Sequence, residues 1–242
     1  MDYFFLLLIP IIAFLYASVG HGGASGYLAL MVLFGISPVL MKPSALVLNI
    51  FVSAIALFQY FRQEHFKWKI LLPFILLSIP LSFLGAKIQI DVHTYKLILA
   101  GCLVIATLRI LGFSDKSSEE GIKELKFVPA LLIGGLLGFV SGLIGIGGGI
   151  LLSPVLLILH WANMKQTAAV SAAFIFLNSI SGLAGASLSS QSFSPEIYIW
   201  AGLAIVGGTG GAWYGSRKFS PVVLKYVLSM VLFSACIKLI LS

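Results

Sequence analysis

The sequence has few charged residues. Asp, Glu, Lys and Arg make up 10% of its 242 residues, whereas 60% are hydrophobic, and soluble domains usually carry about 25% charged residues. Runs without any of these four residues cover 3–41, 43–61, 127–164, 166–195 and 197–216. A membrane-spanning helix needs only about 20 apolar residues. The composition therefore excludes a soluble protein and predicts an all-α polytopic membrane protein.

Acidic residues are especially scarce, and all eight fall at segment ends or in loops: Asp2, Glu64, Asp91, Asp115, Glu119, Glu120, Glu124 and Glu196. Proton relays and sodium sites in transporters commonly use a carboxylate inside the membrane, so neither is expected here. The sequence also lacks a GxxxxGK[ST] motif, an HExxH motif and a nucleophile with a partnered base,. We therefore expect neither an enzyme nor an ATP-driven pump, and no cofactor.

The sequence has only two cysteines, Cys102 and Cys236. Both lie in apolar segments without CxxC spacing, so we expect small core residues and no metal site,. The 15 basic residues are scattered over segment ends, which argues against nucleic acid as a partner and is typical of membrane proteins. Because Met1-Asp2-Tyr3 lacks a basic region, we expect the first membrane segment here rather than a signal peptide.

Glycine, by contrast, is abundant and is concentrated in two stretches. Residues 141–149 contain five glycines, and residues 17–26 are a weaker copy of them. In the alignment of the two, Gly20, Gly22 and Gly23 match Gly145, Gly147 and Gly148. Glycine costs about 1 kcal/mol relative to alanine inside a helix, so both stretches predict interruptions. We call residues 17–26 the first break and residues 141–149 the second break.

The segments around the two breaks also match in order. The matched pairs are segments 43–61 and 166–188, segments 69–88 and 196–216, and segments that begin at Lys96 and Lys225. Each half of the chain therefore contains four helical elements and opens with an element that glycine interrupts. We predict a first transmembrane repeat over residues 1–112, a polar linker over 113–127 and a second repeat over 128–242.

The opening element of each half is too long for one straight span. About 38 residues of helix would measure about 57 Å, whereas the bilayer core is about 30 Å thick. If both elements cross the membrane, the basic residues divide seven to eight between its sides, but if both turn back at the breaks they divide eleven to four. The positive-inside rule favours the second arrangement. It predicts inverted repeats with a cytoplasmic linker, a cytoplasmic loop at 62–69 and both termini outside.

The breaks are also the candidate substrate site. Transporters with inverted repeats bind substrate where interrupted helices present their ends, and the free N–H groups at a helix start favour an anion. Buried amide and hydroxyl groups can add hydrogen bonds. The candidate substrate-binding residues are Gly20, His21, Gly22, Gly23, Ser25, Asn49, Gly145, Gly147, Gly148, Gly149 and Asn178.

Each candidate has a structural alternative. Glycines allow close helix packing in membranes, which is the role that we expect for Gly134, Gly135, Gly138, Gly207 and Gly208. Buried Asn and Ser side chains often bond to a helix backbone. His21 is the only group in the predicted core that titrates near neutral pH. It is either a satisfied structural histidine or a substrate contact that also carries protons.

Blocks 138–149 and 18–26, each followed by a small-residue segment that starts at Lys165 or Lys42, resemble the sulfite exporter TauE/SafE family. This family is also called the 4-toluene sulfonate uptake permeases, and the resemblance covers essentially the whole chain. It implies a small permease of the bacterial inner membrane for sulfite, sulfoacetate or other sulfonates. The sequence departs from the family pattern at His21, and Asn49 and Asn178 are out of register by a few residues.

We therefore expect a multi-pass secondary transporter for a small sulfur oxyanion; a membrane scaffold or accessory subunit without transport is the alternative. Besides the anion and the lipid bilayer, protons and a second copy of the chain are left open as partners. A monoanion that leaves an inside-negative cell gains about 2.3 kcal/mol per 100 mV, which favours export. Import would need a proton, with His21 as the carrier.

The charge distribution predicts the sidedness of two loops. A cysteine at Ser117, in the linker, should react with an impermeant thiol reagent only after the inner membrane is permeabilised, because the linker is cytoplasmic. A cysteine at Ser192 should react without permeabilisation,. If both positions are labelled from the same side, the re-entrant arrangement is wrong and both opening elements cross the membrane.

Overall fold

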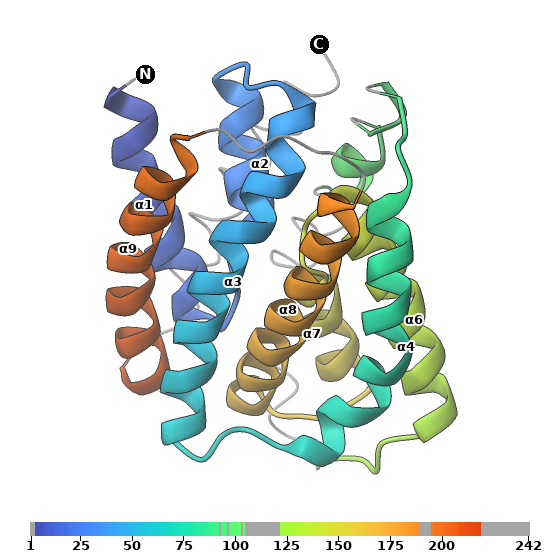
Figure 1. Ribbon diagram of the computed structural model, residues 1–242. Coiled ribbons are helices and arrows are strands. Elements are labelled where there is room, and N and C mark those ends of the chain that lie inside the picture. Colours follow the sequence, from blue (N-terminus) through green and yellow to red (C-terminus); the bar gives the residue numbers. More distant parts are fainter. Residues whose placement is uncertain are drawn as a thin grey trace.

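The computed structural model describes residues 3–91, 93–95, 97–102, 104, 122–188 and 195–218. Within these residues the labelled elements are all helices: α1 (Tyr3–Ser18), α2 (Ala24–Leu33), α3 (Pro38–Arg62), α4 (Trp68–Lys87), α6 (Phe127–Ile144), α7 (Gly149–Ile158), α8 (Met164–Ser187) and α9 (Ile197–Arg217). Figure 1 shows them as one bundle of helices. The predicted all-α class is confirmed.

Four of the described helices are long and apolar enough to cross a membrane: Val39–Arg62, Trp68–Lys87, Phe127–Ile144 and Met164–Ser187. The predicted second segments lie on α3 and α8, and the predicted third segments lie on α4 and α9. Residues 97–102 of the first predicted fourth segment are helical. The second fourth segment, Cys236 and most of the linker lie outside the described residues.

Both glycine stretches interrupt helices, as predicted. The first break separates α1 from α2, and the second separates α6 from α7. At the first break the chain reverses, so that α2 runs back toward the end of the bundle where α1 began (Figure 1). The pair α6 and α7 reverses in the same way but starts from the opposite end of the bundle. Each opening element is therefore a helical hairpin whose tip lies inside the bundle.

The aligned glycines of the two breaks share backbone conformations. Gly20 and Gly145 have φ angles of 77° and 81°, just after α1 and α6. Gly23 and Gly148 have φ angles of 94° and 73° and precede the first residues of α2 and α7. Such positive φ angles are readily adopted only by glycine. The alignment of Gly20 with Gly145 and of Gly23 with Gly148 thus pairs positions of the same local structure.

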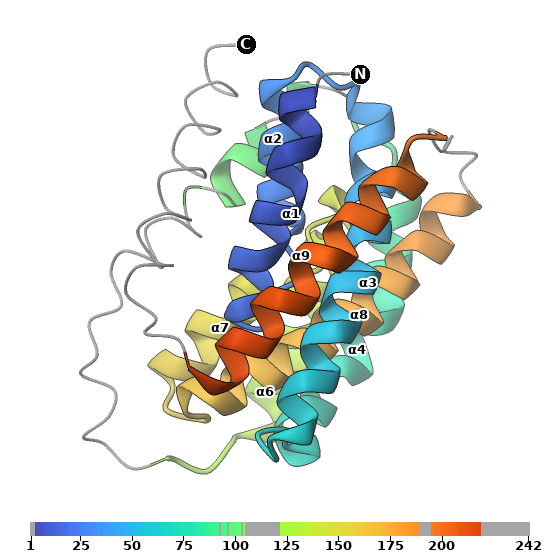
Figure 2. The same cartoon turned by 90° about the vertical axis from the view of Figure 1, so that its left-hand side faces the viewer.

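Glycine also allows helices from the two halves to pack closely. A Cβ atom on Gly138 of α6 would lie 2.4 Å from the Ser78 carbonyl oxygen on α4, and one on Gly207 of α9 would lie 2.0 Å from the Pro10 oxygen on α1. Gly134 packs on α4 in the same way as Gly138. The helix pairs α4–α6 and α1–α9 thus each join one half of the chain to the other, and Figure 2 shows α9 lying across α1. The packing role predicted for these glycines is confirmed.

This packing predicts different effects for two alanine substitutions. Gly138→Ala should destabilise the protein by about 1–3 kcal/mol, because the added methyl group meets the α4 backbone and the helices must separate,. Gly202→Ala on α9 is the control, since no atom lies within 4 Å of the added Cβ. Thermal unfolding in detergent should show a lower midpoint for Gly138→Ala alone. Equal midpoints would contradict the close α4–α6 contact.

Candidate functional site

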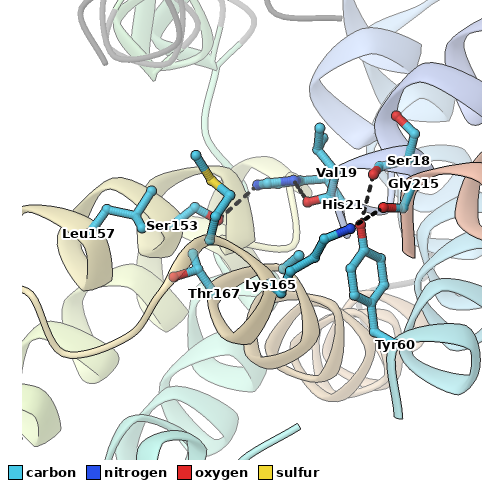
Figure 3. Close-up of a pocket in the computed structure, with 11 residues that line it drawn as sticks. Ser18, Val19, His21, Tyr60, Ser153, Leu157, Lys165, Thr167 and Gly215 are labelled. Carbon is cyan, nitrogen blue, oxygen red and sulfur yellow. Dashed lines mark hydrogen bonds between the residues drawn. The ribbon is translucent and has the colours of Figure 1, made fainter. Parts of the chain in front are cut away.

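A small cavity lies beside the first break. Its volume is about 100 Å³, and its lining residues are Ser18, Val19, His21, Tyr60, Ser153, Leu157, Met164, Lys165, Thr167, Ala168 and Gly215. These residues come from the ends of α1, α3 and α9, from the first break, from α7 and from the start of α8 (Figure 3). No Asp or Glu lines the cavity, whereas His21 and Lys165 do. Its polar groups are therefore suited to an anion.

His21 is held at both ring nitrogens. Its Nδ1 lies 2.9 Å from the Val19 carbonyl oxygen, and its Nε2 lies 3.0 Å from Ser153 Oγ. Because a carbonyl only accepts, we assign the proton of the neutral ring to Nδ1. Ser153 Oγ also lies 3.1 Å from the Gly149 carbonyl oxygen and 2.8 Å from Ser171 Oγ.

This network suits both protonation states of His21. When the ring is neutral, the Ser153 hydroxyl can donate to Nε2 and accept from Ser171. When the ring is protonated, Nε2 donates to Ser153, whose hydroxyl can turn and donate to Gly149,. Rotation of one hydroxyl is therefore enough to accommodate a proton on His21. The same bonds also link the first break to α7, so a structural role for His21 is compatible with them.

Lys165 supplies a positive charge to the cavity. Its Nζ donates to the carbonyl oxygens of Gly215 at 2.7 Å and Ser216 at 3.1 Å, at the end of α9. It also lies 5.9 Å from the centre of the Tyr60 ring. An ammonium group at the C-terminus of a helix is favoured by the helix dipole. Within the described residues these two carbonyls use two of its three N–H donors, which leaves a third for a ligand,.

Thr167, in the first turn of α8, adds an unused hydroxyl. Its side chain lines the cavity and is 2% exposed. Its Oγ1 has no hydrogen-bond partner among the described residues. Buried hydroxyl groups normally have a partner, so a ligand or a water molecule in the cavity would satisfy this one.

His65, in the loop between α3 and α4, reports the electrostatic potential near the cavity. Partial burial lowers its pKa, and the positive charges of Lys165 and Lys67 lower it further. The Tyr60 ring lies between this loop and the cavity, 6.3 Å from the His65 ring, and its hydroxyl donates to the Ser18 carbonyl oxygen at 2.7 Å. The cavity therefore lies at an end of the bundle where positive charge collects.

Asn49 of α3 connects the two breaks. Its Oδ1 accepts the N–H of Ala24, the first residue of α2, at 2.9 Å. Its amide nitrogen is fully buried and has no partner among the described residues. This nitrogen would lie 2.6 Å from a Cβ added to Gly147 of the second break. The amide orientation is fixed by Ala24, so its two donors face the second break.

Two further unpartnered groups surround the second break. Ser141 Oγ and Ser179 Oγ are buried without a partner in the described part of the chain. Ser179 Oγ would lie 3.2 Å from a Cβ on Gly147, and the Ser141 Cβ would lie 3.3 Å from one on Gly148. With Asn49, these hydroxyls leave three polar groups unsatisfied beside the N-terminus of α7.

Protein atoms pack directly against both breaks. A Cβ on Gly22 would lie 2.4 Å from Asn49 Oδ1, and one on Gly149 would lie 2.3 Å from Ile175 Cγ1. The close approach that these glycines permit is therefore to neighbouring helices in this conformation. Substituting them would disturb packing as well as any ligand, so glycine variants cannot identify a binding site by themselves.

The remaining candidates form local contacts. Ser25 Oγ donates to the Tyr16 hydroxyl at 2.9 Å, inside the α1–α2 hairpin. Asn178 Nδ2 donates to Ser78 Oγ at 3.0 Å and to the Phe174 carbonyl oxygen at 2.8 Å. Asn178 thus bonds to α4 and to its own helix, and none of its hydrogen bonds reaches either break. The structure brings Asn49 and His21 to the breaks but gives Asn178 other partners.

Sequence reasoning did not select Lys165, Ser153 or Thr167 as site residues. Lys165 directly follows the charge-free run 127–164 and so resembles a segment boundary, but α8 begins at Met164, so this lysine is inside a helix. A signal was available, because Lys42-Pro43-Ser44-Ala45 and Lys165-Gln166-Thr167-Ala168 share the pattern Lys-x-Ser/Thr-Ala. A lysine that recurs at the same place in both halves favours a function for both.

Comparison with known proteins gives consistent matches over most of the chain. The family described as "Sulfite exporter TauE/SafE" matches residues 5–239. "Probable membrane transporter protein y4hK" of Sinorhizobium fredii is 37% identical over 95% of this chain and 94% of its own length. "Probable membrane transporter protein MJ0441" of Methanocaldococcus jannaschii is 28% identical over 83% and 79% of the two chains. No solved structure gives a significant match.

Proposed function

Because the chain belongs to the sulfite exporter TauE/SafE family of membrane transporters, we propose that it is a secondary transporter for a small oxyanion, sulfite or a short sulfonate. It acts in the bacterial inner membrane, which it crosses several times, and catalyses no chemical reaction. The observation that carries this proposal is the cavity of Lys165, His21 and Thr167, which offers hydrogen-bond donors and a positive charge without an acid.

The cavity size supports a small substrate. A volume of about 100 Å³ is well below the roughly 300–1,000 Å³ of pockets that hold drug-sized ligands. Sulfite, with four non-hydrogen atoms, suits this space better than an aromatic sulfonate. Its oxygens can accept from the free N–H of Lys165 and from the unpartnered Thr167 hydroxyl. Hydrogen bonds from charged donors to oxyanions are among the stronger ones.

The proposed topology has two inverted repeats. Its support is that the hairpin α1–α2 and the hairpin α6–α7 start from opposite ends of the bundle (Figure 1). Arg62, Lys67, Lys126, Lys165 and Arg217 lie at the ends of helices that meet near the cavity or the α3–α4 loop. With the positive-inside rule, the cavity would face the cytoplasm.

The anion would move from the cavity toward the two breaks. Asn49, Ser141 and Ser179 provide unpartnered donors beside Gly147 and Gly148. The start of α7 adds free N–H groups and the positive end of a helix dipole. Since the breaks are tightly packed here, this route requires the hairpins to separate from α3 and α8. His21, which belongs to the first break and lines the cavity, lies where this route would start.

Export needs no coupling to another ion. The membrane potential alone drives a monoanion out of an inside-negative cell with about 2.3 kcal/mol per 100 mV. Import would act against this potential and would require His21 to bring a proton with each anion. We propose export, because no buried carboxylate is present among the described residues to support a second coupling site.

Net flux is the first test of this function. Purified protein in proteoliposomes should release trapped radiolabelled sulfite at a rate that follows an imposed membrane potential, since the anion carries charge. Protein-free liposomes are the control for leakage. A folded protein that gives no flux above this control under any potential would support the alternative, a membrane scaffold or accessory subunit.

The role of His21 can be tested with His21→Gln, which keeps hydrogen bonding but cannot titrate. If export is uncoupled, the variant should keep substantial flux that follows the potential and varies weakly with pH between about 5.5 and 7.5, around the usual histidine pKa. Flux is measured at several pH values in both proteins. Uptake driven by a pH gradient in the native protein, and lost in His21→Gln, would contradict export and indicate proton-coupled import.

A further inference from the structure

The start of α3 repeats the cavity's lysine and hydroxyl at the other end of the bundle. Lys42 and Ser44, in the first two turns of α3, match Lys165 and Thr167, in the first turn of α8, in the pattern Lys-x-Ser/Thr-Ala. Figure 1 shows that α3 begins near the end of the bundle where the N-terminus lies, whereas α8 begins at the opposite end. The two lysines therefore lie at opposite ends of the protein.

The two lysines make equivalent contacts. Lys42 Nζ donates to the Ala86 carbonyl oxygen at 2.8 Å, near the end of α4. Lys165 Nζ donates to the Gly215 carbonyl oxygen at 2.7 Å, near the end of α9. Lys42 thus joins the start of α3 to the end of α4, and Lys165 joins the start of α8 to the end of α9. Both acceptors are backbone carbonyl oxygens, and the two Nζ–oxygen distances are nearly the same.

The surroundings of the two lysines also correspond. Ser44 Oγ and Thr167 Oγ1 are both buried, at 1% and 2% exposure, and neither has a partner among the described residues. Gly145, after α6, packs against Lys42 itself, whereas Gly20, after α1, packs against Ala168, which is three residues after Lys165. The protein therefore has two matching sets of an ammonium group, an unused hydroxyl and a glycine break.

A tyrosine hydroxyl also meets the end of the first helix of each hairpin, but Tyr60 of α3 and Tyr95, after α4, both belong to the first half of the chain. Tyr60 donates to the Ser18 carbonyl oxygen at 2.7 Å, at the end of α1. Tyr95 donates to the Ile144 carbonyl oxygen at 3.1 Å, at the end of α6. Each hairpin thus ends its first helix against a buried tyrosine.

The two ends differ in access. Lys165 is half-buried and lines the cavity, whereas Lys42 is only 5% exposed. The residue aligned with His21 is Ile146, which is 4% exposed. One carbonyl is the single hydrogen-bond acceptor that Lys42 has among the described residues. A buried ammonium group with unused donors is costly in a membrane and indicates a functional site.

We propose that Lys42 and Ser44 form a second anion site, which binds the same small oxyanion from the other face of the membrane. The site is closed in this conformation and opens when the cavity at Lys165 closes. This inference rests on the proposed transport function. It adds that the substrate meets a lysine and a hydroxyl on each face, from equivalent positions in the two halves.

The test measures sulfite transport from each face separately, with the full-length protein in right-side-out and in inverted membrane vesicles. Ser44→Ala should raise the KM for sulfite about tenfold when sulfite is presented at the face of Lys42, because a hydrogen bond to a charged ligand is lost. Thr167→Val should do the same at the face of Lys165. Each variant should leave the KM at the other face unchanged.

Two variants control for general damage. Thr209→Val removes an exposed hydroxyl that bonds to the Ile205 carbonyl oxygen of its own helix at 2.7 Å, and it should leave the KM at both faces unchanged. Ser44→Thr keeps the hydroxyl and should transport with a nearly native KM. If Ser44→Ala fails to fold, Ser44→Cys replaces it with the same expected rise in KM, because a thiol is a weaker donor.

The outcomes separate this inference from the proposed function. If the native protein transports sulfite but the Ser44 variant has a native KM at both faces, Lys42 and Ser44 are only a structural clamp. If the variant raises the KM equally at both faces, one shared site serves both faces. Either result overturns the second site and leaves transport intact. If the native protein gives no flux from either face, the proposed function itself is wrong.

Discussion

The structure depends on satisfying backbone polar groups where helices are interrupted inside an apolar bundle. Water cannot reach such groups in the bilayer, so each free N–H or C=O needs a protein partner or a ligand. Side chains from other helices meet this need: Tyr60 donates to the end of α1, Asn49 accepts from the start of α2, and Lys165 donates to the end of α9. Asn49 and Lys165, which satisfy helix ends here, also belong to the site proposed for an anion, so stability and the proposed recognition share residues.

Local features of the fold could be read from the sequence. Glycine has a specific cost in helices and a specific tolerance of positive φ, so Gly20–Gly23 and Gly145–Gly148 were recognisable as breaks and as equivalents. The positions of the charged residues predicted segments 69–88 and 166–188, whose ends lie within a few residues of those of α4 and α8. His21 and Asn49 could also be selected, because each is a lone polar side chain in an apolar segment at or near a break.

Contacts between distant segments could not be read in this way. No sequence pattern predicts that α9 packs on α1 or that α6 packs on α4. These pairings nevertheless decide which carbonyl oxygen lies within reach of Lys165. Asn178 looked equivalent to Asn49 by residue type, yet a shift of a few positions turns it toward Ser78 of α4. Residue type predicts that a polar group needs a partner, but the three-dimensional arrangement chooses the partner.

The pairing of α1 with α9 has a consequence for biogenesis. The ribosome makes α1 first, but the helix that covers its glycine-packed face emerges only after almost the whole chain has been made. Until then the α1–α2 hairpin lies in the membrane without α9 beside it. The contacts of Tyr60 and Asn49 from α3 stabilise the hairpin at this stage. The α4–α6 pair closes midway, and α9 covers α1 much later. Insertion of this small protein is therefore expected to involve a long-lived intermediate, in which lipid or an insertion chaperone occupies the position that α9 finally takes.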